Sequence, residues 1–107
     1  MKTVKFESSP VLLITSGEKT STWRLFDDKD LSIGDEIALQ KFGHDKPFAK
    51  ATIVEVVRKP FRELTDKDKT GHESYESDDE MYATYSGYYK TKVGQETEVK
   101  IISFALT

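Results

Sequence analysis

Residues 48–58 read FAKATIVEVVR and form the most strand-like segment of the chain. β-branched and aromatic side chains are frequent in it, and such side chains favour the pleated, half-buried surface of a sheet. Lys59-Pro60 follows directly, and proline has no backbone N–H to donate to a strand ladder, so the strand should stop there. A strand of this length needs partners, which constrains the chain to a fold built around a sheet.

Further strands are expected wherever apolar and polar residues alternate or β-formers gather: residues 3–7, 19–26, 36–42 and 97–106. Two segments favour helices. Ser8 and Ser9 precede Pro10, and a serine cap followed by proline at the first helical position marks a helix start, so residues 11–16 should form a short helix that ends in a left-handed turn at Gly17. Residues 76–89 begin with Ser77 as a cap and Glu80 three residues later.

The expected order is therefore β-α-β-β-β, then a loop and a helix, then a last strand. The helices are few and separated by several strands, which argues against a doubly wound parallel sheet. We predict a mainly β (α+β) fold: a small, mostly antiparallel β-barrel with two helices packed on it.

Length, cysteine content and charge limit the number of domains and the classes of function that the chain can have. The 107 residues fit one domain, expected to span 1–107. The absence of cysteine excludes disulfides, thiol catalysis and thiolate metal sites. A net charge of -3 and the acidic stretch 73–80 argue against gripping a duplex by charge alone. A local basic pocket for one nucleotide remains compatible with this charge.

No apolar run approaches the roughly 20 residues that a membrane span requires. The N-terminus also lacks the basic-then-apolar pattern of a signal peptide. We therefore expect a cytoplasmic monomer with no membrane partner. We expect no cofactor and no metal, since His72 lies near Asp66, Asp68 and Glu73 without a recognised ligand spacing.

The strand 19–26 carries the candidate site. One of its faces holds two hydroxyls and a guanidinium, from Thr20, Thr22 and Arg24. This face suits a ligand, although an exposed strand face is the simpler alternative. The opposite face, with Trp23 and Leu25, should belong to the core, although a tryptophan can also stack on a base.

One side of the second helix carries a stripe of apolar and aromatic residues, which should pack on the sheet: Met81, Tyr82, Tyr85, Tyr88 and Tyr89. One tyrosine hydroxyl of this stripe could still reach the mouth of a cleft.

The run Gly17-x-Lys19-x-x-Thr22-x-Arg24 resembles the signature of the ASCH domain family, which belongs to the PUA-like superfamily. Other segments resemble that family in order and spacing: Gly34-Asp35, Lys46-Pro47-Phe48, Phe61-x-Glu63-Leu64-Thr65, Tyr88-Tyr89 and Val99-x-Ile101-Ile102-x-Phe104. The resemblance runs from about Leu12 to Leu106. It implies a PUA-like β-barrel with a cleft beside the first run.

The resemblance also implies a function. The family is proposed to bind RNA or nucleotide-like ligands, here through Lys19, Thr20, Thr22 and Arg24. Small bacterial members include amidohydrolases that remove the acetyl group of N4-acetylcytidine with a lysine, a threonine and a glutamate. Lys19 and Thr22 match the first two, and either Glu73 or Glu76 would be the third.

These residue types suit that chemistry. A desolvated lysine can serve as base to a threonine hydroxyl, and a glutamate can pass the proton to the leaving amine. The planar fork of arginine can anchor a carbonyl or phosphate. We expect a protein that binds RNA or a nucleoside-type ligand. The alternatives are an N4-acetylcytidine amidohydrolase and an interaction module without a ligand.

Overall fold

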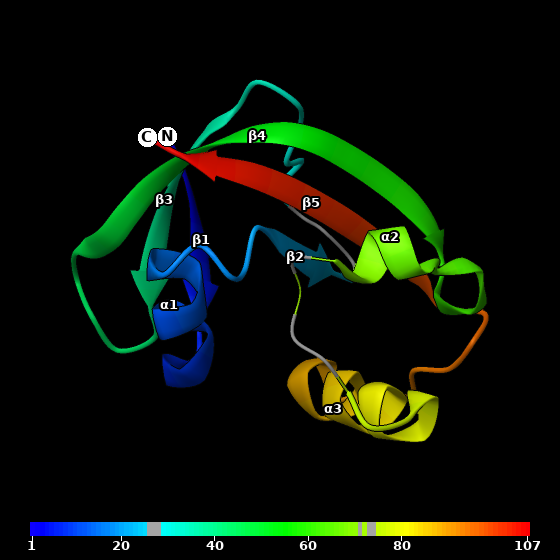
Figure 1. Ribbon diagram of the computed structural model, residues 1–107. Coiled ribbons are helices and arrows are strands. Elements are labelled where there is room, and N and C mark those ends of the chain that lie inside the picture. The colour runs from blue at the N-terminus through cyan, green and yellow to red at the C-terminus, as the bar shows by residue number, and fades with distance from the viewer. Residues whose placement is uncertain (26–28, 71, 73–74) are drawn as a thin grey trace.

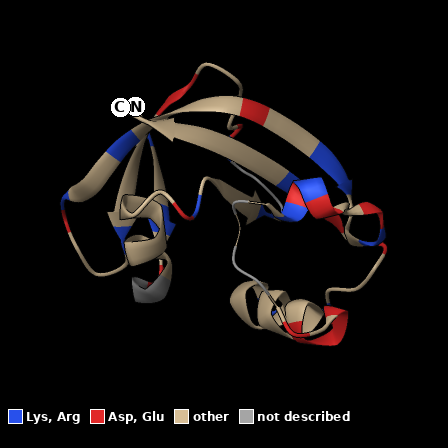
Figure 2. Ribbon diagram, viewed as in Figure 1, with Lys and Arg blue, Asp and Glu red and all other residues tan. Residues whose placement is uncertain are grey.

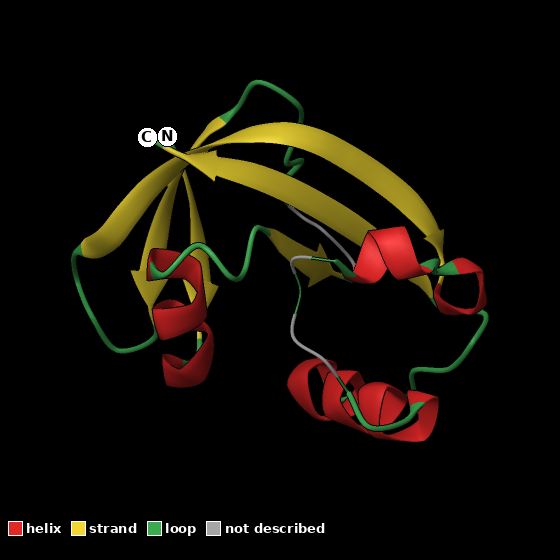
Figure 3. Cartoon of the chain, viewed as in Figure 1, coloured by secondary structure: helices red, strands yellow, loops and turns green. Residues whose placement is uncertain are grey.

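The computed structural model of the protein describes residues 1–25, 29–70, 72 and 75–107. Its elements follow the predicted order, with two short helices added between the fourth strand and the long second helix (Figure 3). They are β1 (Lys2–Phe6), α1 (Ser8–Thr15), β2 (Ser21–Arg24), β3 (Glu36–Lys41), β4 (Pro47–Pro60), the 3₁₀-helix η1 (Phe61–Glu63), α2 (Asp66–Lys69), α3 (Asp78–Tyr89) and β5 (Glu98–Leu106).

The strands form one sheet in the order β1-β3-β4-β5-β2. The β1–β3 pair is parallel and the other pairs are antiparallel. The sheet curls so that β4 and β5 arch over α1 and α3 (Figure 1). A register shift between Ile53 and Glu55 interrupts the β4–β5 ladder, and such irregularities bend strands.

The predicted small, mostly antiparallel barrel with packed helices is confirmed in the form of a half-barrel. Among the described residues, β1 and β2 are its two edge strands.

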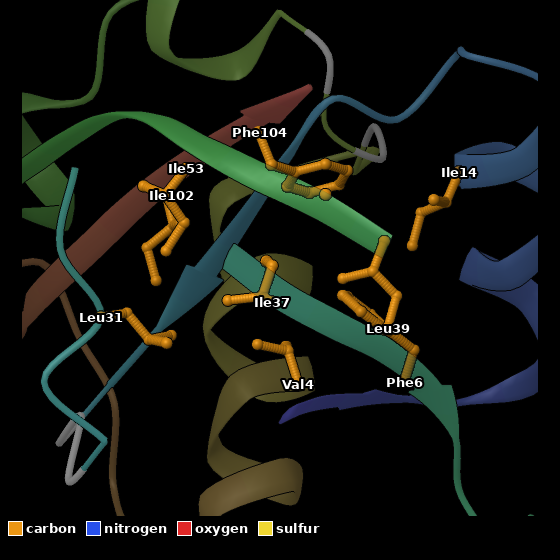
Figure 4. Packing of buried hydrophobic residues seen from close by; sticks show 10 residues of the cluster. Val4, Phe6, Ile14, Leu31, Ile37, Leu39, Ile53, Ile102 and Phe104 are labelled. Atoms are coloured by element: carbon orange, nitrogen blue, oxygen red, sulfur yellow. The ribbon is translucent and has the colours of Figure 1, made fainter. Parts of the chain in front are cut away.

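Two apolar clusters fill the concave side of this half-barrel. The first lies against β1, β3 and α1 (Figure 4) and consists of Val4, Phe6, Ile14, Leu31, Ile37, Leu39, Ala51, Ile53, Ile102 and Phe104. The second packs α3 against β2 and β5 and consists of Trp23, Leu25, Phe61, Met81, Tyr85, Val93, Val99 and Ile101. Helix α1 therefore packs against the first cluster and helix α3 against the second.

Helix α1 begins at Ser8, three residues before the predicted start at Val11. Pro10 therefore lies in the first turn, where the missing N–H costs little because the first four helical N–H groups have no partner in the helix. The predicted stop at Gly17 is confirmed, since this residue has φ 85° and donates its N–H to the Ile14 carbonyl at 3.1 Å.

Helix α3 is capped as predicted, because Ser77 Oγ accepts a hydrogen bond from the Glu80 N–H at 3.1 Å. Its predicted packing stripe is confirmed by the burial of Met81 and Tyr85. Lys90, with φ 53°, ends the helix. None of the described helices is both long and apolar enough to cross a membrane.

Candidate functional site

A cavity of about 410 Å³, here the main cavity, opens between β2, the C-terminal half of α3 and the junction of β1 with α1. Its volume lies within the range of roughly 300–1,000 Å³ that is usual for small-molecule pockets. It is large enough for one small ligand and too small for a folded nucleic acid. The lining combines charged, hydroxyl and aromatic side chains.

Three of the residues predicted from the sequence line the main cavity together: Lys19, Thr22 and Arg24. The turn after α1 positions Lys19, whose N–H donates to the Leu13 carbonyl at 2.9 Å. Pairing of β2 with β5 sets the register of the other two. Lys19 is 3% exposed and Thr22 is 5% exposed, so both lie in the wall of the cavity and not on an open strand surface.

The other predicted residues lie elsewhere. Thr20 is exposed and does not line the main cavity. Glu76 is exposed and lines a neighbouring cavity of about 260 Å³. Glu73 lies outside the described residues.

An aromatic wall closes the α3 side of the main cavity. It consists of Trp23, His72, Tyr75, Tyr85, Tyr88 and Tyr89. The His72 ring stacks on Trp23 with centroids 3.9 Å apart and an interplanar angle of 11°. His72 Nε2 also lies 3.2 Å from the Tyr85 hydroxyl.

Trp23 belongs to the core, as predicted, and also contributes to the cavity wall. It is 3% exposed, and its Nε1 is buried without a hydrogen-bond partner. Thr22 and Trp23 are neighbours in sequence and point to opposite faces of β2. Both residues line the cavity although they lie on opposite faces, because β2 is an edge strand with no neighbour on one side.

Arg24 connects the two edges of the half-barrel. Its Nη2 donates to the Lys5 carbonyl on β1 at 2.9 Å, and its guanidinium carbon lies 5.3 Å from the centre of the Phe6 ring. Its Nε is buried without a hydrogen-bond partner. The open seam between β2 and β1 is therefore bridged by a side chain, and the main cavity lies beside it.

Charge is unevenly distributed around the site. The described lining residues include the cations Lys5, Lys19 and Arg24 and a single carboxylate, Glu7. The acidic first turn of α3, residues 78–80, gathers at the end of that helix that lies farther from α1 (Figure 2). The cationic side of the main cavity is thus separated from the most acidic part of the helix.

A hydrogen bond fixes α3 against β2 at the cavity. The Tyr89 hydroxyl accepts from the Leu25 N–H at 3.0 Å. Within the described ranges, no group of three or more histidine, aspartate or glutamate side chains is arranged to hold a metal ion. The chemistry visible at the site is that of a buried amine, a hydroxyl, a guanidinium and aromatic faces.

No sequence signal pointed to His72 or Tyr75 as lining residues, since both lie in a polar segment without periodicity. Tyr85, Tyr88 and Tyr89 were predicted as a packing stripe, and only the packing of α3 against β2 shows that part of this stripe also faces the cavity.

No protein-family model and no curated protein sequence matches the chain. Solved structures do. An ASCH domain from Lactobacillus crispatus is 13% identical, with a TM-score of 0.71 over 98% of this chain and 78% of that one. The ASCH protein from Zymomonas mobilis is 15% identical, with a TM-score of 0.69 over 96% of this chain and 65% of its own.

A hypothetical protein of known structure is 21% identical, with a TM-score of 0.75 over 100% of both chains. At these identities the likeness concerns the fold and not the activity. The resemblance stated from the sequence is confirmed at this level: the chain has an ASCH-like fold.

Proposed function

We propose that the protein binds a nucleoside-type ligand, either a free nucleoside or one nucleotide of an RNA, in the main cavity. The observation that carries this proposal is the joining of an aromatic wall to the buried polar residues Lys19 and Thr22 in one cavity of about 410 Å³. A nucleobase is a flat ring with a polar edge, so aromatic faces can stack on it while an amine and a hydroxyl bond its edge.

Size and charge support the same class of ligand. The cavity accommodates a single nucleoside, and a net charge of -3 disfavours a long duplex held through many phosphates. RNA would therefore be bound through one unstacked base and not along a helix.

The test is calorimetric titration of the protein with the four ribonucleosides. Replacing Thr22 by Val keeps the shape of the side chain and removes its hydroxyl. We expect this variant to bind about 10-fold more weakly, the effect of one lost hydrogen bond in a closed site. Thr52→Val on β4, away from the lining residues, is the matched control and should bind as the wild type.

Absence of binding by every nucleoside and by a short single-stranded RNA, with the protein folded, would contradict the proposal and favour an interaction module without a ligand. Equal weakening by the two valine variants would also contradict it, because the effect would then not arise in the main cavity.

A second candidate, hydrolysis of N4-acetylcytidine, is favoured by the placement of a buried lysine and a threonine in the same wall. Thr22 Oγ would attack the acetyl carbonyl and Lys19 would take its proton. The cytidine amine would leave with a proton, and water would then release acetate from the threonine ester. The Thr22 hydroxyl has no hydrogen bond to the described residues that would compete with this role.

Chromatographic detection of cytidine released from N4-acetylcytidine tests this candidate. Release that falls by about 100-fold or more in Thr22→Val would support it. Glu73→Gln and Glu76→Gln, measured side by side, would then identify the carboxylate. No release by the wild type would leave ligand binding as the function.

A further inference from the structure

We propose that the Arg24 end of the main cavity is a phosphate subsite, so that the preferred ligand carries a phosphate next to its nucleoside. This inference rests on the proposed function, because it assigns one end of the same cavity. It predicts a nucleoside monophosphate or an RNA nucleotide in preference to an unphosphorylated nucleoside.

Arg24 has unused hydrogen-bonding capacity in the described chain. A guanidinium has five N–H donors in a fixed fork. The structure shows one of them bonded, to the Lys5 carbonyl, and Nε is buried with no acceptor. Nε is too buried to meet a ligand, but the Nη N–H groups that have no acceptor in the described chain can still donate to an incoming anion.

Arg24 differs in exposure and pairing from the other arginines of the chain, Arg58 and Arg62. Both are more than half exposed, and both pair with glutamates: Arg58 with Glu98 at 3.9 Å and Arg62 with Glu96 at 2.9 Å. Arg24 is less exposed than either and forms no ion pair with any carboxylate of the described chain. A partly desolvated cation without a counter-charge attracts an anion more strongly than an exposed one does.

The residues that line the cavity around Arg24 are arranged to suit a nucleotide. Lys5 lines the same end, and the Phe6 ring packs against the guanidinium, which holds the fork in place. The aromatic wall lies on the α3 side, across from β1. A cationic end opposite an aromatic wall matches a nucleotide, which has a flat base at one end and an anionic phosphate at the other.

This phosphate could belong to a free nucleotide or to the backbone of an RNA. The shared chemistry is a phosphate oxygen bonded by a guanidinium fork. A free nucleotide presents a dianionic monoester, whereas an RNA presents a monoanionic diester. The two sources can be separated by comparing a monophosphate with a trinucleotide.

The experiment is calorimetric titration with the four ribonucleosides, their 5′- and 3′-monophosphates, inorganic phosphate and the trinucleotide UpCpU. We expect the best monophosphate or the trinucleotide to bind at least about 10-fold more tightly than the matching nucleoside. We also expect added NaCl to reduce this preference, because salt screens the attraction between charges. The tighter of the two phosphorylated ligands identifies the source.

Four variants test where the phosphate preference arises. Arg24→Gln should reduce the ratio of the dissociation constant of the nucleoside to that of the phosphorylated ligand to near one. Arg24→Lys, which keeps the charge but loses the fork, should retain only part of the ratio. Arg58→Gln, an exposed arginine outside the cavity, should leave the ratio unchanged. Thermal melts of each variant show whether it folds, and Lys5→Gln, at an exposed side chain, should lower the ratio even if Arg24 proves necessary for folding.

Each outcome decides something. Equal affinity for nucleosides and all phosphorylated ligands would overturn the phosphate subsite and leave the proposed function standing. A phosphate preference that survives in both Arg24→Gln and Lys5→Gln would overturn the assignment to this end of the cavity. Failure of every ligand to bind the wild type would overturn both proposals.

Discussion

Lys19 and Lys100 are both buried, with exposed fractions of 3% and 4%, but only Lys19 lines the main cavity. Both lysines interact with other residues of the chain, and removing one partner of a buried charge leaves the other unpaired, which destabilises a fold. We therefore expect Lys19→Met and Lys100→Met both to lower the melting temperature, while only Lys19→Met weakens nucleoside binding by the folded protein, by about 10-fold or more.

Lys100→Met is the matched control, because it makes the same change at a lysine of equal burial outside the cavity. Its nucleoside affinity should equal that of the wild type. Thermal melts and titrations of the two variants give the comparison. A large loss of stability in Lys19→Met, with binding reduced only in proportion to the unfolded fraction, would show that this lysine serves the fold and not the ligand.

Some residues of the candidate site could be predicted from the sequence, and the others could not, for physical reasons. Strand alternation places Thr22 and Arg24 on one face, because local geometry decides which strand residues share a face. Lys19 was added only by the family resemblance of the run from Gly17 to Arg24. Alternation also selected Thr20, which does not line the main cavity. His72 could not be found this way. Its position against Trp23 depends on how the polar segment after β4 folds back over β2, and no sequence periodicity records that contact.

Among the elements, α2 depends most on a few polar contacts, because it has four residues and none is buried. The Asp68 carboxylate accepts hydrogen bonds from Lys59 Nζ at 2.6 Å and from the Thr65 N–H at 2.9 Å. Burial acts to raise the pKa of Asp68, but the bonds from Lys59 and Thr65 outweigh it and lower that pKa below its ordinary value of 3.8.

A carboxyl group with a lowered folded-state pKa stabilises the fold at pH values above its unfolded-state pKa and loses this contribution as the pH falls through the folded-state pKa. We expect Asp68→Asn to be less stable than the wild type at pH 7 by about 1 kcal/mol, or roughly 4 °C in melting temperature. The difference should shrink as the pH falls below 3.8. Asp66→Asn, on the same helix, should change stability less, and a pH-independent gap for Asp68→Asn would contradict this account.

The order of the strands along the chain could be predicted because each strand has its own alternation or β-rich composition. Helix α2 was missed because four residues carry no helical period, and its capping pair, Thr65 and Asp68, is visible only when read as a box. The early start of α1 was missed because proline was placed at the first helical position, whereas the first turn tolerates it at any position.

For the whole molecule, the feature that determines the site is the incomplete closure of the barrel. In the described chain β1 and β2 pair on one side only, and the seam between them is crossed by the hydrogen bond from Arg24 to the Lys5 carbonyl. The number of strands and the mostly antiparallel character of the sheet were predicted from the sequence, but the pairing β1-β3-β4-β5-β2 was not. The open seam was not, because the curl of a sheet depends on twist and bulges along the whole of β4 and β5.

An edge strand carries unpaired N–H and C=O groups, and another copy of the chain can pair with them. Charged residues on an edge hinder such pairing, and here β1 carries Lys2 and Lys5 while β2 ends at Arg24. We expect Arg24→Leu to form dimers or larger species at high concentration on light-scattering chromatography, whereas Arg58→Leu stays at the wild-type size. A wild-type elution profile for Arg24→Leu would contradict this expectation.

The same guanidinium would then have two consequences. In each molecule it would attract the ligand into the seam, and between molecules it would keep one copy from supplying the strand that another copy lacks. A change of Arg24 to an apolar residue would therefore weaken recognition of a charged ligand and favour self-association.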